Sequence, residues 1–258
     1  MSIRQQNRLF AERVRNGELL NSTMVTINAP QVSELLSDSG LDWLFIDSEH
    51  STFDTAALQC LLQASTIPCL VRVPIAERIA IRNVLDMGAA GIIVPQVNSA
   101  KTAQEIVSWC RYPPDGIRGV GIFRGNCYGF EFEDHIKSAA QETIIVVQAE
   151  HKDAVAEIED IASVTGIDAI LIGPYDLSAS YGKAGMIDDP QIQAAMDTIT
   201  NACLSNNKIL GFFGMNVNAV MPWIERGATL ITTGVDCITL GINTRQYVTD
   251  LQSKISDK

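Results

Sequence analysis

Glu150 and Asp176 are the residues of this sequence whose positions most clearly suggest chemistry. Glu150 closes the apolar run 144–149, and Asp176 comes shortly after the apolar run 169–172. In parallel α/β folds, active sites are built where buried strands emerge into solvent. Two acids at successive strand ends could hold one divalent cation, which would make the protein a metal enzyme. A salt bridge or a helix cap is the alternative role for each acid.

The ligand type narrows the choice of metal. Carboxylate oxygens with few protein ligands and several waters suit Mg²⁺ or Mn²⁺, with Co²⁺ as a further candidate. Zinc normally recruits Cys or His, and neither residue forms a ligand-spaced cluster in this sequence.

Other polar residues fall at the ends of neighbouring apolar runs. Asp47 and His50 follow the second run, Arg72 ends the third, and Gln148 precedes Glu150. A buried Arg72 needs an anionic partner, which could be an internal acid or an oxygen of the substrate. His50 could act as a base near neutral pH if a carboxylate orients it, and a structural loop histidine is the alternative.

The elements that would position these residues are short apolar runs alternating with amphipathic segments. The candidate strands are residues 24–26, 43–47, 69–72, 91–94, 144–149, 169–172, 209–213 and 230–233. Candidate helices begin near Pro30, Thr55, Arg78, Ser99, Asp153, Pro190, Asn218 and Ile238. Most runs are continuously apolar, which is typical of parallel strands covered on both faces.

Eight such units predict an α/β fold, the (β/α)₈ TIM barrel, as a single domain over residues 1–258. A doubly wound open sheet is the alternative. The sequence lacks the glycine motif by which such sheets bind dinucleotides. That motif must follow a strand and begin a helix, whereas the glycine-containing segment 88–91 follows a predicted helix and precedes a strand.

Composition limits the class of protein. The net charge of −11 argues against nucleic acid as a partner, since nucleic-acid binding needs a basic face. No segment has the length and apolarity of a membrane span, and the N-terminus has no apolar signal core. Six scattered cysteines without a C-x-x-C motif predict reduced thiols in a cytoplasmic protein.

One segment, residues 110–133, is long and rich in Gly and Pro. Loops of this length inside a domain are usually functional or disordered. Arg118, Arg124 and Tyr128 could serve a substrate pocket or a subunit contact, or could anchor the loop by salt bridges. His135, just beyond the loop, is predicted to be solvated on a surface helix.

Several stretches of the sequence occur together in one known family. They are residues 42–50, 71–74, 84–89, 111–114, 116–121, 148–150 and 172–180, with weaker similarity on to 234–236. In this set the chain resembles the HpcH/HpaI aldolase family, the metal-dependent class II pyruvate aldolases. The resemblance implies reversible cleavage of a 4-hydroxy-2-oxo acid, such as a 2-keto-3-deoxy sugar acid, into pyruvate and an aldehyde.

The resemblance also implies roles for individual residues. Glu150 and Asp176 would ligate the metal, and Arg72 would stabilise the enolate oxygen. His50 would be the acid/base that exchanges a proton with the C4 hydroxyl. Gln148 would help to hold the 2-oxo acid.

The loop 173–176 would complete the substrate site through Gly173, Tyr175 and Asp176. Tyr175 stands where better-known members usually have Ala, and Ser48 stands where they usually have Gly. A bulky Tyr175 beside the metal ligand would narrow or reshape the aldehyde pocket, which bears on the substrate rather than on the enolate chemistry.

Asp86 matches a family acid held to raise the basicity of the histidine. It ends the helix after the third strand, so it should lie at the opposite end of its own barrel from His50. The coupling would then be indirect or cross a subunit boundary. Asp47, three residues before His50, is the simpler local partner.

Three alternatives to this aldolase compete. A Schiff-base aldolase would need a lysine inside the barrel mouth, and the lysines fall in predicted helices, loops or strand starts. A CoA-ester lyase or a decarboxylating C–C bond former could use the same metal site. A non-catalytic barrel acting as a scaffold is the third. Members of the family form hexamers, so the resemblance implies that this protein is a homo-oligomer.

Overall fold

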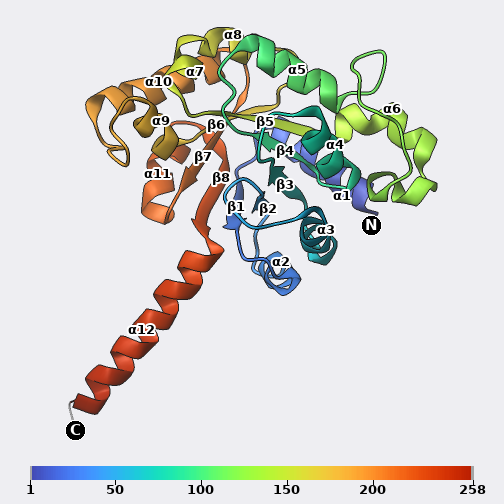
Figure 1. The fold of residues 1–258 in the computed structure, drawn as a ribbon. Coiled ribbons are helices and arrows are strands. Elements are labelled where there is room, and N and C mark those ends of the chain that lie inside the picture. The colour runs from blue at the N-terminus through green and yellow to red at the C-terminus, as the bar shows by residue number, and fades with distance from the viewer. Residues whose placement is uncertain (1, 257–258) are drawn as a thin grey trace.

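The computed structural model describes residues 2–256, whose strands close into a parallel barrel. Successive strands pair in chain order, and the last pairs with the first. The strands are β1 (Leu20–Val25), β2 (Trp43–Asp47), β3 (Cys69–Arg72), β4 (Gly91–Val94), β5 (Ile144–Ala149), β6 (Ala169–Ile172), β7 (Ile209–Gly214) and β8 (Ala228–Val235). The predicted single-domain (β/α)₈ barrel is confirmed (Figure 1).

Helices follow the strands and surround the barrel (Figure 1). They are α1 (Ile3–Arg15), α2 (Pro30–Ser37), α3 (Thr55–Ala64), α4 (Arg78–Asp86), α5 (Ala100–Cys110), the 3₁₀ helix η1 (Arg124–Gly129), α6 (Phe132–Glu142), α7 (Lys152–Ala156), α8 (Ile158–Ser163), α9 (Pro174–Ser180), α10 (Pro190–Ser205), α11 (Val217–Glu225) and α12 (Asp236–Ser256).

The strands from β2 to β6 begin and end at the predicted residues. The predicted range for β1 was wrong, because the strand already begins at Leu20 and includes polar residues. Ser22 is fully buried, and its hydroxyl lies 2.9 Å from that of Thr232 on β8. A polar residue paired inside the barrel gives no apolar signal in the sequence.

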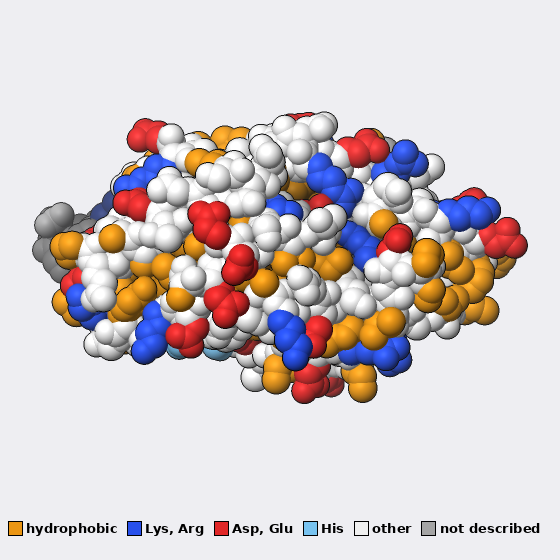
Figure 2. Space-filling view, turned by 90° about the horizontal axis from the view of Figure 1, so that it is seen from above, with side chains coloured by type: hydrophobic (Ala, Val, Ile, Leu, Met, Phe, Trp, Pro, Cys, Tyr) orange, Lys and Arg blue, Asp and Glu red, His pale blue; other side chains and the backbone are white. Residues whose placement is uncertain are grey.

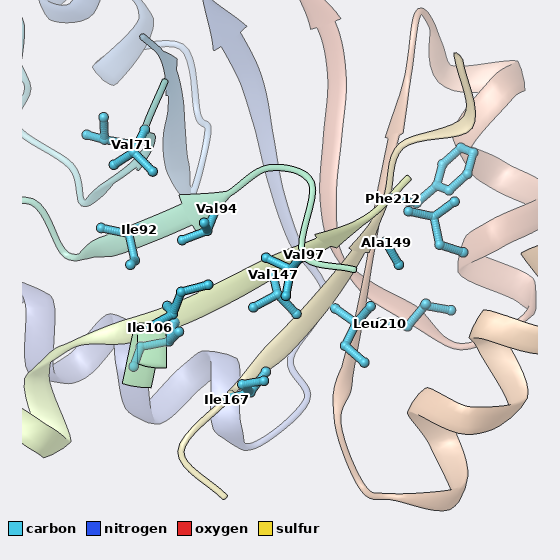
Figure 3. Packing of buried hydrophobic residues seen from close by; sticks show 14 of the residues in the cluster. Val71, Ile92, Val94, Val97, Ile106, Val147, Ala149, Ile167, Leu210 and Phe212 are labelled. Carbon is cyan, nitrogen blue, oxygen red and sulfur yellow. The ribbon is translucent and has the colours of Figure 1, made fainter. Parts of the chain in front are cut away.

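The core has two layers because successive strand residues point to opposite faces. On β2, Trp43 and Phe45 point into the barrel, whereas Leu44 and Ile46 belong to the layer between strands and helices. Figure 3 shows this outer layer, in which the side chain of Ile106 on α5 lies near strand residues such as Val147. With both faces covered, the strands β2 to β6 are largely apolar.

Helix α1, which was not predicted, covers the amino end of the barrel. Phe10 packs against Trp43 with 6.2 Å between ring centroids, and both are buried. The sequence carries one local signal for this helix, a capping box in which the Ser2 side chain accepts a bond from the backbone of Gln5. Its burial at the amino end leaves the carboxyl end open for a site.

The segment 110–133 is anchored at the amino end of the barrel, opposite the mouth. Arg118 donates to Asp86 over 3.0 Å, and Arg124 donates to the carbonyl of Met87 over 2.9 Å. Of the roles considered for this segment, both arginines therefore have that of anchoring the loop. Hydrophobic side chains of the loop, including Phe130, remain exposed. Figure 2 shows hydrophobic side chains gathered at the right-hand end of the molecule, the end at which α6 lies in Figure 1.

The prediction that His135 is solvated was wrong. The residue is 5% exposed, and Nδ1 lies 3.2 Å from Glu142. The rings of Tyr112 and Phe123 meet it edge-on, each with 5.9 Å between centroids. Both rings come from the loop that precedes α6, so the local sequence of the helix does not reveal that the histidine is covered.

Helix α12 leaves the barrel after β8 and stands free of it (Figure 1). Every residue of this helix after Asp236 is exposed except Gly241, which is half-buried. Across residues 2–256, the structure has no helix that is both long and apolar enough to span a bilayer.

Candidate active site

A cavity of about 290 Å³ opens at the carboxyl end of the barrel, where the predicted site should lie. Apolar side chains such as Phe45, Leu171 and Phe213 form part of its lining. The predicted site residues that also line it are Asp47, His50, Arg72, Gln148, Gly173, Tyr175 and Asp176. The fold thus gathers residues from four strand ends around one space.

Arg72 is held rigidly at the floor of this cavity. Its Nε and Nη2 donate to the two oxygens of Asp47 over 2.8 and 2.7 Å, and both side chains are almost completely buried. Strands β2 and β3 are paired with Asp47 opposite Arg72, so the register itself creates the ion pair. Two of the five guanidinium N–H groups are used in this pair, which leaves others for a substrate oxygen.

Glu49 is a site residue to which sequence reasoning gave no role. Its carboxylate lies 3.2 Å from Nε of Arg72 and 3.7 Å from Nε2 of His50. Burial raises the pKa of Glu49, and the negative charges of Asp47 and Asp176 add to this while Arg72 and His50 oppose it. The signal that could have found it is its place between Asp47 and His50.

His50 lies at the entrance of the cavity with an exposed side chain. Asp47, the expected partner of the ring, instead accepts a bond from the backbone N–H of His50 over 3.4 Å. The acid nearest the ring is Glu49. Asp47 therefore shapes the turn that carries the histidine, and Glu49 is the residue placed to orient its ring.

Glu150 ends β5 and is buried directly behind the cavity wall. Its oxygens accept bonds from the backbone N–H of Gln96 over 2.8 Å and from Nε2 of Gln148 over 2.6 Å. Burial, together with the negative charges of Asp176 and Glu49, raises its pKa to about 7, although the Gln96 N–H and Arg72 act in the opposite direction.

Gly173 is the residue that lets the Glu150 carboxylate take this position. A Cβ at residue 173 would lie 2.6 Å from Oε2 of Glu150 and 2.8 Å from its Cβ, which is too close for either contact. Any side chain at this position would displace the acid. Gln148, on the same strand, keeps its Oε1 buried without a partner among residues 2–256.

Asp176 and Tyr175 occupy the first turn of α9, directly after β6. Both side chains are exposed and line the cavity. The backbone N–H groups of this first turn have no intrahelical partner, so they are available to a carboxylate or a similar anion. The loop between β6 and α9 thus presents an acid, a bulky ring and free N–H groups together.

The residues around Glu150 fit a hard divalent cation. The negative charges of Asp176 and Glu49 add to the effect of burial in raising the pKa of Glu150, and Arg72 acts in the opposite direction. A cation would relieve this repulsion, and each Glu150 oxygen keeps a second lone pair to offer. The part of the chain that is described has no group of three or more His, Cys, Asp or Glu side chains arranged to hold a metal. The two-acid pair therefore suits Mg²⁺ or Mn²⁺, which keep several waters, better than zinc.

Asp86 is not brought to His50 within the chain. It ends α4, is bonded to Arg118, and is absent from the residues that line the cavity. Burial raises the pKa of Asp86, although Arg118 opposes the rise. The expected placement at the other end of its own barrel agrees with these contacts. Direct action on His50 of the same chain does not.

No lysine is found among the residues that line the cavity. Lys208 is partly buried and directly precedes β7. Its Nζ donates to the carbonyls of Val164 and Ile167. A Schiff-base mechanism therefore has no nucleophile in this cavity.

The closed barrel and its mouth define a class of protein, a (β/α)₈-barrel enzyme whose acids, arginine and histidine suit enolate chemistry. Comparison with known proteins agrees. The sequence profile of the HpcH/HpaI aldolase/citrate lyase family matches residues 24–241. The chain belongs to this family.

Two characterised relatives and one solved structure show how close the match is. A hydroxypyruvate/pyruvate aldolase of Roseobacter denitrificans is 34% identical over 93% of this chain and 94% of its own length. A 5-keto-4-deoxy-D-glucarate aldolase of Klebsiella pneumoniae is 35% identical over 80% of this chain and 82% of its own. The crystal structure of a family member from Burkholderia cenocepacia superimposes with a TM-score of 0.91 at 30% identity, covering 95% and 99% of the two chains.

These matches make the protein a carbon–carbon lyase of the aldolase class. Because both named relatives are aldolases, a CoA-ester lyase is the less supported alternative. A purely structural barrel does not agree with the site or with the relatives.

Proposed function

We propose that the protein reversibly cleaves a 4-hydroxy-2-oxo acid into pyruvate and an aldehyde, using a divalent cation held by Glu150 and Asp176. The observation that carries the proposal is the position of Glu150 against Gly173, a residue that lines the same cavity as Asp176 and Arg72. When bound, the cation would act as a Lewis acid that favours negative charge on the 2-oxo group.

Arg72 would stabilise the enolate that forms as the C3–C4 bond breaks. Because Asp47 fixes its guanidinium before substrate arrives, little reorganisation is needed when charge develops on the substrate oxygen. Asp47 is then a positioning residue. The same ion pair keeps Arg72 compensated while the cavity contains only water.

His50 would accept the proton of the C4 hydroxyl on cleavage and return it on synthesis. Its exposed position suits a base that must meet an incoming aldehyde, and the adjacent carboxylate of Glu49 would stabilise the protonated ring. Asp86 would influence His50 only from another subunit or through intervening residues.

The 2-oxo acid would be held by the opposite wall. Gln148 carries a buried, unpartnered Oε1 that can accept a bond from a hydroxyl group or contact a cation. Gly173, Tyr175 and Asp176 would bind the substrate carboxylate mainly through backbone N–H groups of the first turn of α9.

A homo-oligomer and a cytoplasmic location belong to the same proposal. Helix α12 and the loop 110–133 expose hydrophobic side chains that a second subunit could cover. All six cysteines are free thiols, as expected in a reducing compartment. The resemblance to family members suggests a hexamer.

The metal assignment can be tested by removing either ligand. Glu150→Gln or Asp176→Asn should lower aldol cleavage by about a thousandfold or more, because the stabilisation of the enolate is lost. Chelation of the wild type should have the same effect, and Mg²⁺ or Mn²⁺ should restore it. Mn²⁺ should also raise the melting temperature of the wild type but not of either variant.

Asp160→Asn is a matched control, since Asp160 is an exposed acid on α8 that does not line the cavity and has no assigned role. It should keep both activity and stabilisation by Mn²⁺. Full turnover of either ligand variant in chelator would show that the metal assignment is wrong.

A further inference from the structure

A second cavity of about 470 Å³ lies beside the catalytic one. It is formed where α10 and α11 pack near β7, elements that Figure 1 shows next to one another. Three residues, Pro174, Tyr175 and Phe213, line both cavities. Tyr175 therefore stands in the wall between the place of the 2-oxo acid and this second space.

The floor of the second cavity is apolar and rigid. Phe212 and Trp223 stack with 4.3 Å between ring centroids and 12° between planes, and both are almost completely buried. Met196, also buried, and Met215, at the carboxyl end of β7, extend this surface. Such a surface suits alkyl or aromatic groups.

The polar residues of the second cavity do not change this character. Arg226 lies over the Trp223 ring at 4.6 Å and is bonded to Asp197. Gln193 donates to the carbonyl of Ile187 over 2.9 Å. The other two, Asp188 and Asn218, are exposed at the rim, where water solvates them.

We propose that this second cavity is the aldehyde subsite, and that the enzyme prefers aldehydes with a hydrophobic alkyl or aromatic substituent over polyhydroxylated ones. The inference rests on the proposed function. In the synthetic direction, C3 of pyruvate loses a proton and forms the new bond to the aldehyde carbon. The aldehyde oxygen takes up a proton, while the substituent passes Tyr175 and lies against Phe212 and Trp223.

A series of straight-chain aldehydes with pyruvate tests this assignment in the wild-type enzyme with Mg²⁺ or Mn²⁺. From acetaldehyde upward, kcat/KM should rise by up to about fourfold for each added methylene until the cavity is filled. Benzaldehyde should exceed glyceraldehyde by about tenfold or more. A flat or falling series, or a preference for glyceraldehyde, would overturn the inference.

Exchange of the C3 protons of pyruvate with deuterated water, followed by NMR, separates this inference from the proposed function. Exchange with a flat aldehyde series overturns the aldehyde subsite alone. Absence of exchange in the presence of metal overturns the proposed function and the subsite with it.

Met215→Glu places a charge inside the second cavity and should lower kcat/KM for pentanal by about tenfold or more. Pyruvate proton exchange should stay at the wild-type rate, because Met215 lines only the second cavity. The matched control is Met221→Glu on the exposed surface of α11, outside both cavities, which should leave both rates unchanged. Equal effects of the two substitutions on pentanal would contradict the assignment.

Discussion

At the scale of single residues, the mouth of the barrel depends on one buried ion pair. Asp47 and Arg72 are 1% and 7% exposed, and two short hydrogen bonds join them. A buried charge without its partner is strongly destabilising, so each residue requires the other. The same pair fixes the guanidinium that faces the substrate, which links stability to catalysis at this point.

Asp47→Asn should therefore lower both stability and activity. The uncompensated Arg72 should reduce the free energy of unfolding by about 3 kcal/mol, measured in urea at one fixed protein concentration. The value of kcat should fall as well, because the guanidinium is no longer held in place.

Glu49→Gln is the comparison for this prediction. Glu49 also contacts Arg72, but over 3.2 Å and with a partly exposed carboxylate, so its loss should cost less than about 1 kcal/mol. Equal stability losses in the two variants would show that Asp47 is not the main partner of Arg72.

At the scale of elements, α1 is joined to α6 by a buried network of charges. Arg4 donates to both oxygens of Glu142, which also lies beside His135 and Ser138. Although burial alone would raise it, hydrogen bonds from His135, Arg4 and Ser138 lower the pKa of Glu142 to about 2. These two helices are far apart in the sequence. The charged network between them therefore fixes two distant segments together at the amino end of the barrel.

This pKa predicts an acid-sensitive contribution to stability. The pKa of Glu142 is below its ordinary value of 4.5, so its stabilisation is complete above that value and is lost as the pH falls through about 2. The amount is about 3 kcal/mol. Glu142→Gln should be less stable than the wild type at neutral pH, and urea unfolding should show this difference shrinking towards pH 2. A difference that stays constant with pH would contradict the assigned network.

At the scale of the whole molecule, α12 contacts the barrel through its first turn and otherwise projects away from it (Figure 1). Five of its hydrophobic residues are at least half exposed, namely Leu240, Tyr247, Val248, Leu251 and Ile255. They recur at helical spacing along one face, which is the pattern of a helix that packs against another surface. The proposed homo-oligomer would cover this face with a second copy of the chain.

Leu251→Glu should weaken the oligomer, because it places a charge in the middle of this face. Light scattering coupled to size-exclusion chromatography should show a smaller particle, while circular dichroism should show an intact barrel. Thr249→Glu adds the same charge on the opposite side of α12 and should leave the particle size unchanged. A monomeric wild type would contradict the proposed covering of this face.

The sequence predicted much of the fold, and the reason differs from strand to strand. Strands β2 to β6 are buried on both faces, so their apolar runs marked them directly. β1 was misplaced because Ser22 pairs with Thr232 across the barrel. α1 was missed because what stabilises it is its packing under Trp43, a contact between distant segments.

For the site, the sequence by itself determined which residues come to the mouth, because a residue that ends a parallel barrel strand must lie at the carboxyl end. Asp47, Arg72 and Gln148 line the cavity for this reason, and Glu150 lies directly behind its wall. Their roles in catalysis stay predictions. The resemblance to the HpcH/HpaI family rested on the order of these motifs along the chain. It is confirmed by the family profile that matches residues 24–241.

Only the tertiary structure decided how these residues pair with one another. It joined Asp47 to Arg72, placed Glu49 beside His50, and separated Asp86 from both. It also revealed the apolar cavity beyond Tyr175, whose lining comes from several separate segments of the chain. Such pairings depend on strand register and on side-chain directions in space, and neither is written in the local pattern of the sequence.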